Sequence, residues 1–85
     1  MQPNRPHLLL DHLIERLRLR NDAALSRLLE VAPPVISKIR HRILRFGDTL
    51  LLRTHDITDI EVRELLDLRK RQEAADALAD QKVAA

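Results

Sequence analysis

Four cationic side chains lie close together in the middle of this chain and could bind an anion. They are Lys38, Arg40, Arg42 and Arg45, and no Asp or Glu occurs between Val31 and Gly47. Guanidinium and ammonium groups donate charge-assisted hydrogen bonds to phosphate and carboxylate oxygens. The stretch therefore favours a directed surface for an anionic partner. The alternative, a solvated helix face without a partner, fits the composition equally well.

The net charge of +2 conceals an uneven distribution along the chain. Residues 1–53 carry ten Lys or Arg and five Asp or Glu, whereas residues 54–85 carry five and eight. The first part is therefore positive and the second negative. Such asymmetry is typical of a protein that presents one basic face to its partner.

No set of residues for catalysis or metal binding stands out. The chain has no Cys and a single Gly, which argues against a thiolate metal site, a disulfide and a Gly-rich phosphate loop. The four histidines show no H-E-x-x-H spacing; they are His7, His12, His41 and His55. No nucleophile–base pair is evident. We expect neither an enzyme nor a cofactor or metal site.

The composition favours one small helical domain. The chain has 85 residues, of which 45% are hydrophobic and 33% charged. It has one aromatic residue, Phe46, so the core must be aliphatic, and a chain rich in Leu, Ala, Arg and Glu favours an all-α fold. No apolar run approaches the roughly 20 residues that span a bilayer. We expect no signal peptide and a cytoplasmic, nucleoid-associated protein.

The hydrophobic pattern predicts five helices between a flexible lead-in of residues 1–6 and a tail of residues 69–85 that is either helical or frayed. The predicted helices cover residues 7–19, 22–30, 34–42, 48–55 and the segment from Ile60 onward. In the first of them, the i, i+3, i+4, i+7 spacing predicts a buried face, formed by Leu10, Leu13, Ile14 and Leu17.

The second and third predicted helices are joined by a very short connection. Asn21 or Asp22 is a suitable N-cap for the second helix. Pro33 disfavours a helical conformation at Ala32, and Pro34 suits the first turn of the third helix. Two short helices joined this closely, the second of them basic, are typical of a pair that inserts one helix into the major groove of DNA.

These two helices carry the pattern L-S-x-x-L-x-V-x-x-x-x-I-S-K-I, from Leu25 to Ile39. The pattern resembles that of the Cro/C1-type (XRE-like) family of helix-turn-helix proteins, and the resemblance covers about residues 8–68. It implies a compact five-helix bundle like that of the lambda repressor. It also implies a domain over residues 7–68 that binds double-stranded DNA, as a homodimer on a palindromic operator, with helix 34–42 in the major groove.

The sequence departs from the family pattern at three places. Glu30 stands where the family commonly has Gly, and a positive φ at this residue would cost about 1 kcal/mol relative to Gly. Arg42 stands where a Gly often ends the recognition helix. Pro33 and Pro34 replace polar side chains that read bases in the family, so base reading must fall on fewer residues.

The resemblance and the residue types together suggest a set of DNA contacts. Predicted base contacts are Lys38, through guanine O6 and N7, and Val35 and Pro34, through a thymine methyl group. Predicted phosphate contacts are Asn21, Arg40, His41, Arg42 and Arg45. Alternatives remain: Lys38 could touch only phosphate or solvent, Val35 could cover the helix junction, and Asn21 could be a cap alone.

The predicted dimer interface lies on the last helix and the tail. Its residues are Leu65, Leu66, Leu68 and Leu78. In the alternative interpretation, all of them except Leu78 belong to the core of one copy.

The sequence thus predicts a DNA-binding transcriptional regulator, expected to be a repressor, from a bacterium or phage. Two alternatives stay open. An adaptor could keep the fold and bind a protein through the C-terminal tail, or an antitoxin could bind its own operator and neutralise a toxin with residues 69–85.

Overall fold

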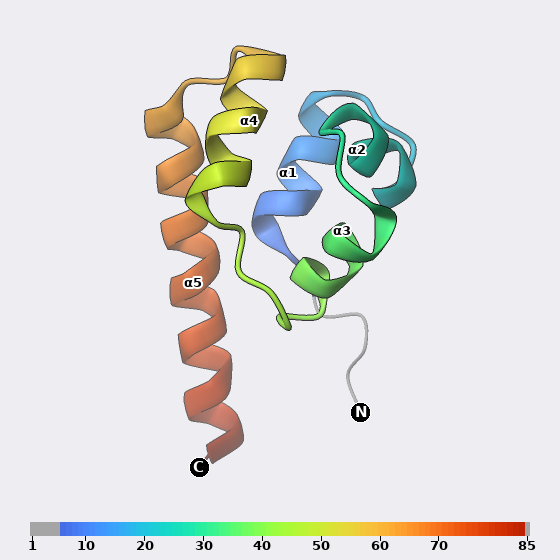
Figure 1. Cartoon of the computed structure of the whole chain (residues 1–85). Helices are drawn as coiled ribbons and strands as arrows, with labels where there is room; N and C mark the ends of the chain where they lie inside the picture. Colours follow the sequence, from blue (N-terminus) through green and yellow to red (C-terminus); the bar gives the residue numbers. More distant parts are fainter. Residues whose placement is uncertain (1–5, 85) are drawn as a thin grey trace.

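The computed structural model describes the backbone of residues 6–84 and the side chains of residues 6–79. The described residues form five α-helices and no strand, which confirms the predicted all-α class (Figure 1). The helices are α1 (Leu8–Arg16), α2 (Asp22–Leu28), α3 (Pro33–Arg40), α4 (Asp48–Thr58) and α5 (Val62–Ala84).

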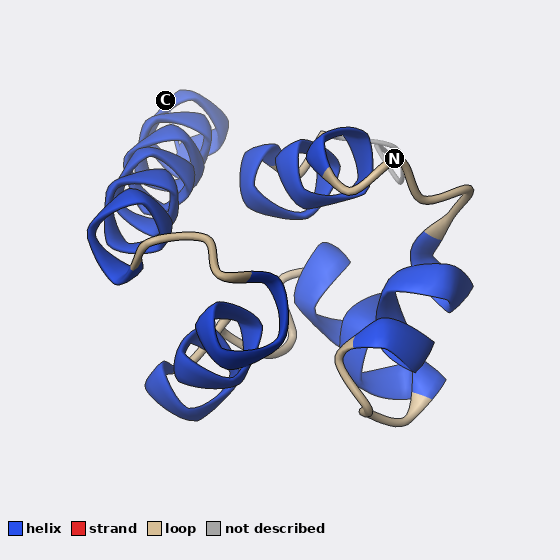
Figure 2. Ribbon diagram, turned by 90° about the horizontal axis from the view of Figure 1, so that it is seen from above, coloured by secondary structure: helices blue, strands red, loops and turns tan. Residues whose placement is uncertain are grey.

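Helix α1 lies between two helix pairs, with α2 and α3 on one side and α4 and α5 on the other (Figures 1 and 2). Helices α4 and α5 pack against each other and run in opposite directions. Helix α1 packs on both α2 and α5, and α2 packs on α3. The C-terminal part of α5 extends past the other helices (Figure 1).

The core is aliphatic apart from Phe46, as the composition predicts. It is formed by Leu9, Leu10, Leu13, Leu25, Leu29, Ile36, Ile39, Phe46, Leu51, Ile60, Leu65 and Leu68. The buried face of α1 is rotated relative to the predicted one. Leu9 is fully buried, whereas Ile14 and Leu17 are only partly buried. The reason is that α1 contacts both α2 and α5, so its apolar surface is wider than a single stripe.

Several helix boundaries differ from the prediction by a few residues. Gly47 is the N-cap of α4, and α4 continues past the predicted end at residue 55 to Thr58. Helix α5 begins at Val62 and continues through the predicted tail to Ala84. The two predicted features of α3 are present: Ala32 is extended, with ψ at 142°, and the helix begins with two prolines.

Four helices end with a left-handed residue that is not glycine: Asp59 caps α4 with φ at 62°, and the other three residues, which follow α1, α2 and α3, share one hydrogen-bonding pattern. The φ angles are 56° at Arg18, 58° at Glu30 and 61° at Arg42. After each of these residues a backbone N–H reaches back to a carbonyl five residues earlier, as in Val31 N to Ser26 O at 3.0 Å. This is the Schellman pattern, which usually has Gly at the left-handed position. Each side chain there costs about 1 kcal/mol relative to glycine.

We predict that Glu30→Gly stabilises the protein by up to about 1 kcal/mol, because it removes the steric conflict between Cβ and the backbone at positive φ. Urea unfolding followed by circular dichroism measures the change. Glu30→Ala is the matched control, since it removes the same carboxylate but keeps a Cβ. Equal stabilities of the two variants would contradict the assignment of strain to Glu30.

None of the helices in the described part of the chain is both long and apolar enough to cross a membrane.

Candidate nucleic-acid interface

Helices α2 and α3 form a closely packed pair at one end of the molecule. Leu25 of α2, Leu29 at its C-cap and Ile36 of α3 are fully buried in the common core. Ser26 is 1% exposed, and its hydroxyl donates to Ala23 O at 2.8 Å, so a small polar side chain satisfies its hydrogen bond within its own helix. The pair is therefore held by apolar contacts on its inner side, and its outer side is left to solvent.

The outer side of α3 is a continuous exposed arc. Its residues are Pro33, Pro34, Ser37, Lys38 and His41. Pro34, Lys38 and His41 follow the i, i+4, i+7 spacing of one helix face, while Ile36 and Ile39 point into the core. Lys38 makes no ion pair with any described residue. Its ammonium group can therefore meet an external acceptor.

Three residues on or next to this arc differ in their exposure and contacts: Asn21, Val35 and His41. Asn21 is exposed, and its Oδ1 accepts from Ala24 N at 2.9 Å, so Asn21, and not Asp22, is the N-cap of α2 among the two predicted candidates. Val35 is half-buried and packs against the core, so only part of its side chain is open to solvent. His41, the C-cap of α3, is exposed.

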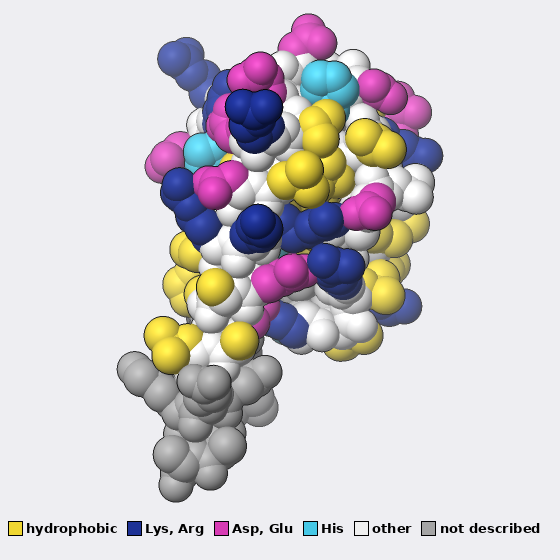
Figure 3. All heavy atoms as spheres, turned by 90° about the vertical axis from the view of Figure 1, so that its left-hand side faces the viewer, with side chains coloured by type: hydrophobic (Ala, Val, Ile, Leu, Met, Phe, Trp, Pro, Cys, Tyr) yellow, Lys and Arg dark blue, Asp and Glu magenta, His cyan; other side chains and the backbone are white. Residues whose placement is uncertain are grey.

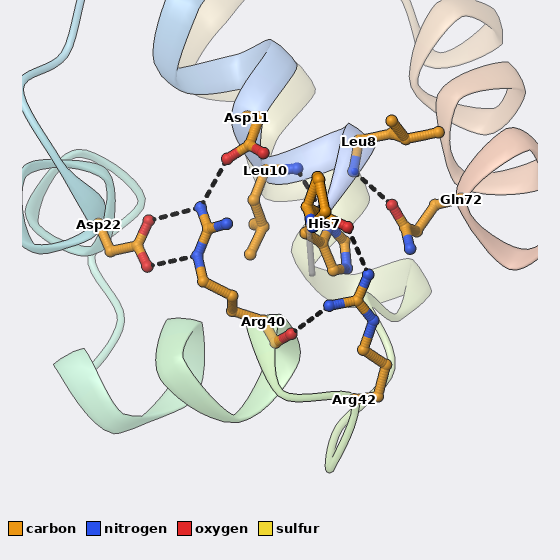
Figure 4. A network of polar contacts seen from close by, with 9 residues as sticks. His7, Leu8, Leu10, Asp11, Asp22, Arg40, Arg42 and Gln72 are labelled. Atoms are coloured by element: carbon orange, nitrogen blue, oxygen red, sulfur yellow. Dashed lines mark hydrogen bonds and ion pairs between the residues drawn. The ribbon is translucent and has the colours of Figure 1, made fainter. Parts of the chain in front are cut away.

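Arg40 is turned away from the arc and ties three helices together (Figure 4). Its guanidinium donates to both carboxylate oxygens of Asp22, at 2.7 and 2.8 Å, and to Asp11 at 2.9 Å. The hydrogen bond to Asp22 raises the pKa of Arg40 above its usual value. Because all these contacts lie between α1, α2 and α3, Arg40 holds the three helices together, and the predicted phosphate contact would require it to leave Asp11 and Asp22.

Arg42 is also held within the protein. Its side chain donates to the carbonyl oxygens of Arg40 and Pro6, each at 2.6 Å, and its Nε lies 3.2 Å from Asp76 of α5. The side chain is only 21% exposed. It joins the end of α3 to the segment before α1 and to α5, so we do not assign it to DNA.

Arg45 is the most accessible of the predicted arginines. It lies on the connection between α3 and α4, and its Nε is 2.5 Å from Glu73 of α5. This hydrogen bond raises the pKa of Arg45. Both side chains are well exposed, and surface ion pairs of this kind are weak. A phosphate group could therefore replace the Glu73 carboxylate.

Two residues near this helix pair were not predicted from the sequence as site residues. Ser37 is exposed between Pro33 and His41, and its hydroxyl can donate and accept. Arg53 of α4 donates to the carbonyl of Glu30 at 3.2 Å and fixes the end of α2. A polar residue at helical spacing could have indicated Ser37, but no sequence signal links Arg53 to a residue 23 positions earlier.

The predicted dimer residues divide into two groups. Leu65 and Leu68 are 0% and 8% exposed and belong to the core of the protomer, so they cannot contact a second copy. The periodicity of α5 could not separate its inner face from its outer one. Leu66 and Leu78 are 40% and 58% exposed and remain available.

Comparison with known proteins gives no match, whether with a family model, a curated protein or a solved structure. The function must therefore be argued from the residues themselves.

His7 is the buried titratable group next to the arginines at the end of α3 (Figure 4). Its Nδ1 accepts from Leu10 N at 3.2 Å and caps α1, which requires the neutral ring. Burial, followed by the positive charges of Arg42 and Arg40, lowers the pKa of His7 to about 4. The folded protein therefore holds this histidine neutral at pH values where the unfolded chain protonates it.

We predict that this histidine makes the protein less stable in mild acid. Its contribution is complete above pH 6.5 and is lost as the pH falls from 6.5 towards 4, by about 3 kcal/mol in total. Urea unfolding at pH 7.5, 6.5, 5.5 and 5 measures the slope. His7→Asn keeps an N-cap that does not titrate. A slope in this variant as steep as in the unmodified protein would show that other groups cause the loss.

Proposed function

We propose that this protein is a sequence-specific DNA-binding transcriptional regulator, expected to be a repressor. In this proposal, α2 and α3 form a helix-turn-helix and α3 enters the major groove. The observation that carries the proposal is the exposed arc of α3, with Lys38 unpaired among the described residues while the neighbouring Arg40 is committed to Asp11 and Asp22.

The dimensions of α3 support this placement. An α-helix with its side chains is about 10–12 Å across and fits a major groove about 12 Å wide, and the eight residues of α3 form a helix about 12 Å long that can lie in it. The prolines at its start carry no side-chain hydrogen-bond donor. The start of the helix, which in this proposal lies deepest in the groove, can therefore contact DNA through its shape and apolar surface. Pro34 and the exposed part of Val35 can then contact a thymine methyl group, and Lys38 can donate to guanine O6 and N7.

Phosphate contacts are assigned to groups around the arc that can reach outward. Asn21 and His41 lie at the start of α2 and the end of α3, and Arg45 can exchange Glu73 for a phosphate. So few contacts by one copy would bind weakly. We therefore propose that two copies bind a palindromic site with half-sites about one helical turn apart, and that the protein acts at the nucleoid.

We predict that Lys38→Ala lowers the affinity for the specific DNA site by roughly 10- to 100-fold, because one base contact contributes about 1–3 kcal/mol. The measurement is a titration with DNA from upstream of the protein's own gene and with random DNA, at two salt concentrations. The unmodified protein should prefer the specific DNA by about 10³-fold or more at both salt concentrations.

Arg71→Ala is the control, because it also removes one exposed cation but lies on α5, where it pairs with Asp67. It should bind DNA almost as the unmodified protein does. Equal effects of the two substitutions would mean that Lys38 acts only through net charge. Weak binding that is equal on both DNAs and vanishes with salt would refute the proposed function.

We also predict that Glu73→Gln strengthens DNA binding at low salt. The substitution releases Arg45 from its carboxylate partner, so one more phosphate contact forms per copy and the log–log salt slope steepens by about 0.9 for each copy bound. Asp67→Asn is the matched control, because it removes the same charge from α5 but frees Arg71, not Arg45. If both variants strengthen binding to the same extent, the effect is one of net charge and Arg45 has no specific role.

A protein-binding adaptor is the second candidate, favoured by the part of α5 that extends past the other helices with Leu78 58% exposed. The antitoxin alternative would use the same segment. In either case, shortening α5 before Leu78 should abolish binding of the partner protein, while Lys38→Ala should have no effect on it.

A further inference from the structure

The chain turns back in the same way at the ends of α1, α2 and α3, and in each turn an apolar residue follows the left-handed one. The backbone N–H groups of Leu19, Val31 and Ile43 donate to carbonyls five residues earlier, at 2.9, 3.0 and 2.8 Å. In this Schellman pattern, a side-chain contact between the donor residue and the turn of the acceptor residue is common. The donor and acceptor residues pair as Leu19 with Ile14, Val31 with Ser26 and Ile43 with Lys38.

The first two pairs face the core. Ile14 and Leu19 both pack against the core at the end of α1. At the end of α2, Ser26 is 1% exposed and Val31 packs against the core. In each of these motifs the two residues of the pair therefore lie on the same side of the helix end.

The third pair faces solvent. Lys38 lies on the exposed arc of α3, and Ile43 is 70% exposed, more than any other large hydrophobic side chain in the part of the chain that the structure describes. Since each of the other pairs keeps to one side, Ile43 extends the arc at the end of α3, next to Lys38. The backbone holds it there, because the N–H groups of Ile43 and Leu44 both donate to Lys38 O. The motif that buries an apolar residue after α1 and α2 thus presents one to solvent after α3.

The surroundings of Ile43 carry positive charge. Residues 31–47 include no Asp or Glu, and Lys38 makes no ion pair with any described residue. The two carboxylates that approach α3, those of Asp11 and Asp22, are bound within the protein on the side away from the arc. A partner that contacts Ile43 therefore meets a cation beside it.

The acidic side chains that reach the connection after α3 come from α5 and lie on another side of it. Glu73 and Asp76 line a hollow together with Leu44, and Ile43 is not among the residues that line it. On the α5 side of the molecule, anionic and cationic side chains are interleaved (Figure 3). The surface around Ile43 is thus the one that suits a polyanion with an apolar group.

The major groove of DNA offers this combination. The C5-methyl group of thymine projects into the groove, and phosphates line the rim of the groove. In the proposed function the start of α3 lies deepest, so the residue that follows its end lies nearer to the rim. Ile43 is β-branched and stiff at χ1, so ordering its side chain against a methyl group costs little entropy.

We propose that Ile43 contacts the C5-methyl group of a thymine close to the base pair that Lys38 contacts. This inference rests on the proposed function and adds a specificity-determining residue that lies outside α3. The apolar contacts assigned to Pro34 and Val35 lie at the start of the helix, whereas this contact lies at its end. The arc would then read apolar groups on both sides of the cation.

The test replaces each thymine of the specific DNA site, one at a time, with deoxyuridine, which pairs in the same way but lacks the methyl group. The site is the segment upstream of the protein's own gene that the unmodified protein protects. One of the replacements should lower the affinity of the unmodified protein about 4-fold for each copy bound, as expected for one buried methyl group. Ile43→Ala should bind the normal site at least 4-fold more weakly per copy and should be insensitive to that same replacement.

The salt dependence and a matched variant serve as controls. Ile43→Ala should leave the log–log salt slope unchanged, because an apolar contact releases no counterions. Leu52→Ala also shortens an exposed apolar side chain, 52% exposed, but on α4. It should bind both DNAs as the unmodified protein does. A thymine that Pro34 or Val35 contacts should cause the same loss in the unmodified protein and in Ile43→Ala. Circular dichroism checks that each variant is folded.

Specific binding that Ile43→Ala leaves unchanged would overturn this inference and keep the proposed function. Deoxyuridine effects that are equal in the two proteins at every thymine would do the same. A changed salt slope in Ile43→Ala would also overturn it, because the substitution would then act through phosphate contacts. If the unmodified protein prefers no DNA, the proposed function is refuted and this inference falls with it.

Discussion

The guanidinium of Arg40 holds α3 against both α1 and α2. It joins α3 to Asp22 at the start of α2 and to Asp11 of α1, with a side chain only 23% exposed. Such a pair can add little net stability, yet loss of one partner leaves an uncompensated charge in a partly buried place. The interaction therefore acts mainly by specifying one orientation of α3 relative to α1 and α2. With Arg40 held inward, the opposite arc of α3 must face solvent.

Helix α5 supports the same region from the other side. Gln72, only 3% exposed, accepts from the backbone N–H of Leu8 and donates to Asp76 at 2.8 Å, and Asp76 in turn holds Arg42. Arg69 donates to the carbonyl of Phe46 at 3.2 Å and fixes the connection that follows α3. The acidic C-terminal part thus neutralises arginines next to α3. As a result, the cationic stretch from residue 31 to 47 presents much less free charge than its composition indicates.

The arc of α3 remains exposed, and Lys38 on it makes no ion pair with any described residue. In the proposed function one copy of so small a module offers few contacts to DNA, and a second copy would double them.

The sequence by itself determined the helical class, the aliphatic core, a cap for α2 at Asn21 or Asp22 and the break between α2 and α3, because these depend on local periodicity, on the side chains that cap helices and on the backbone limits of proline. It also predicted that Lys38 contacts DNA bases, which requires an outward-facing side chain, and Lys38 is exposed. Only the tertiary structure decided which arginines stay available and which leucines of α5 are buried. Those outcomes depend on partners far away in the chain, such as Asp22 for Arg40 and Glu73 for Arg45, and no local pattern encodes such pairings.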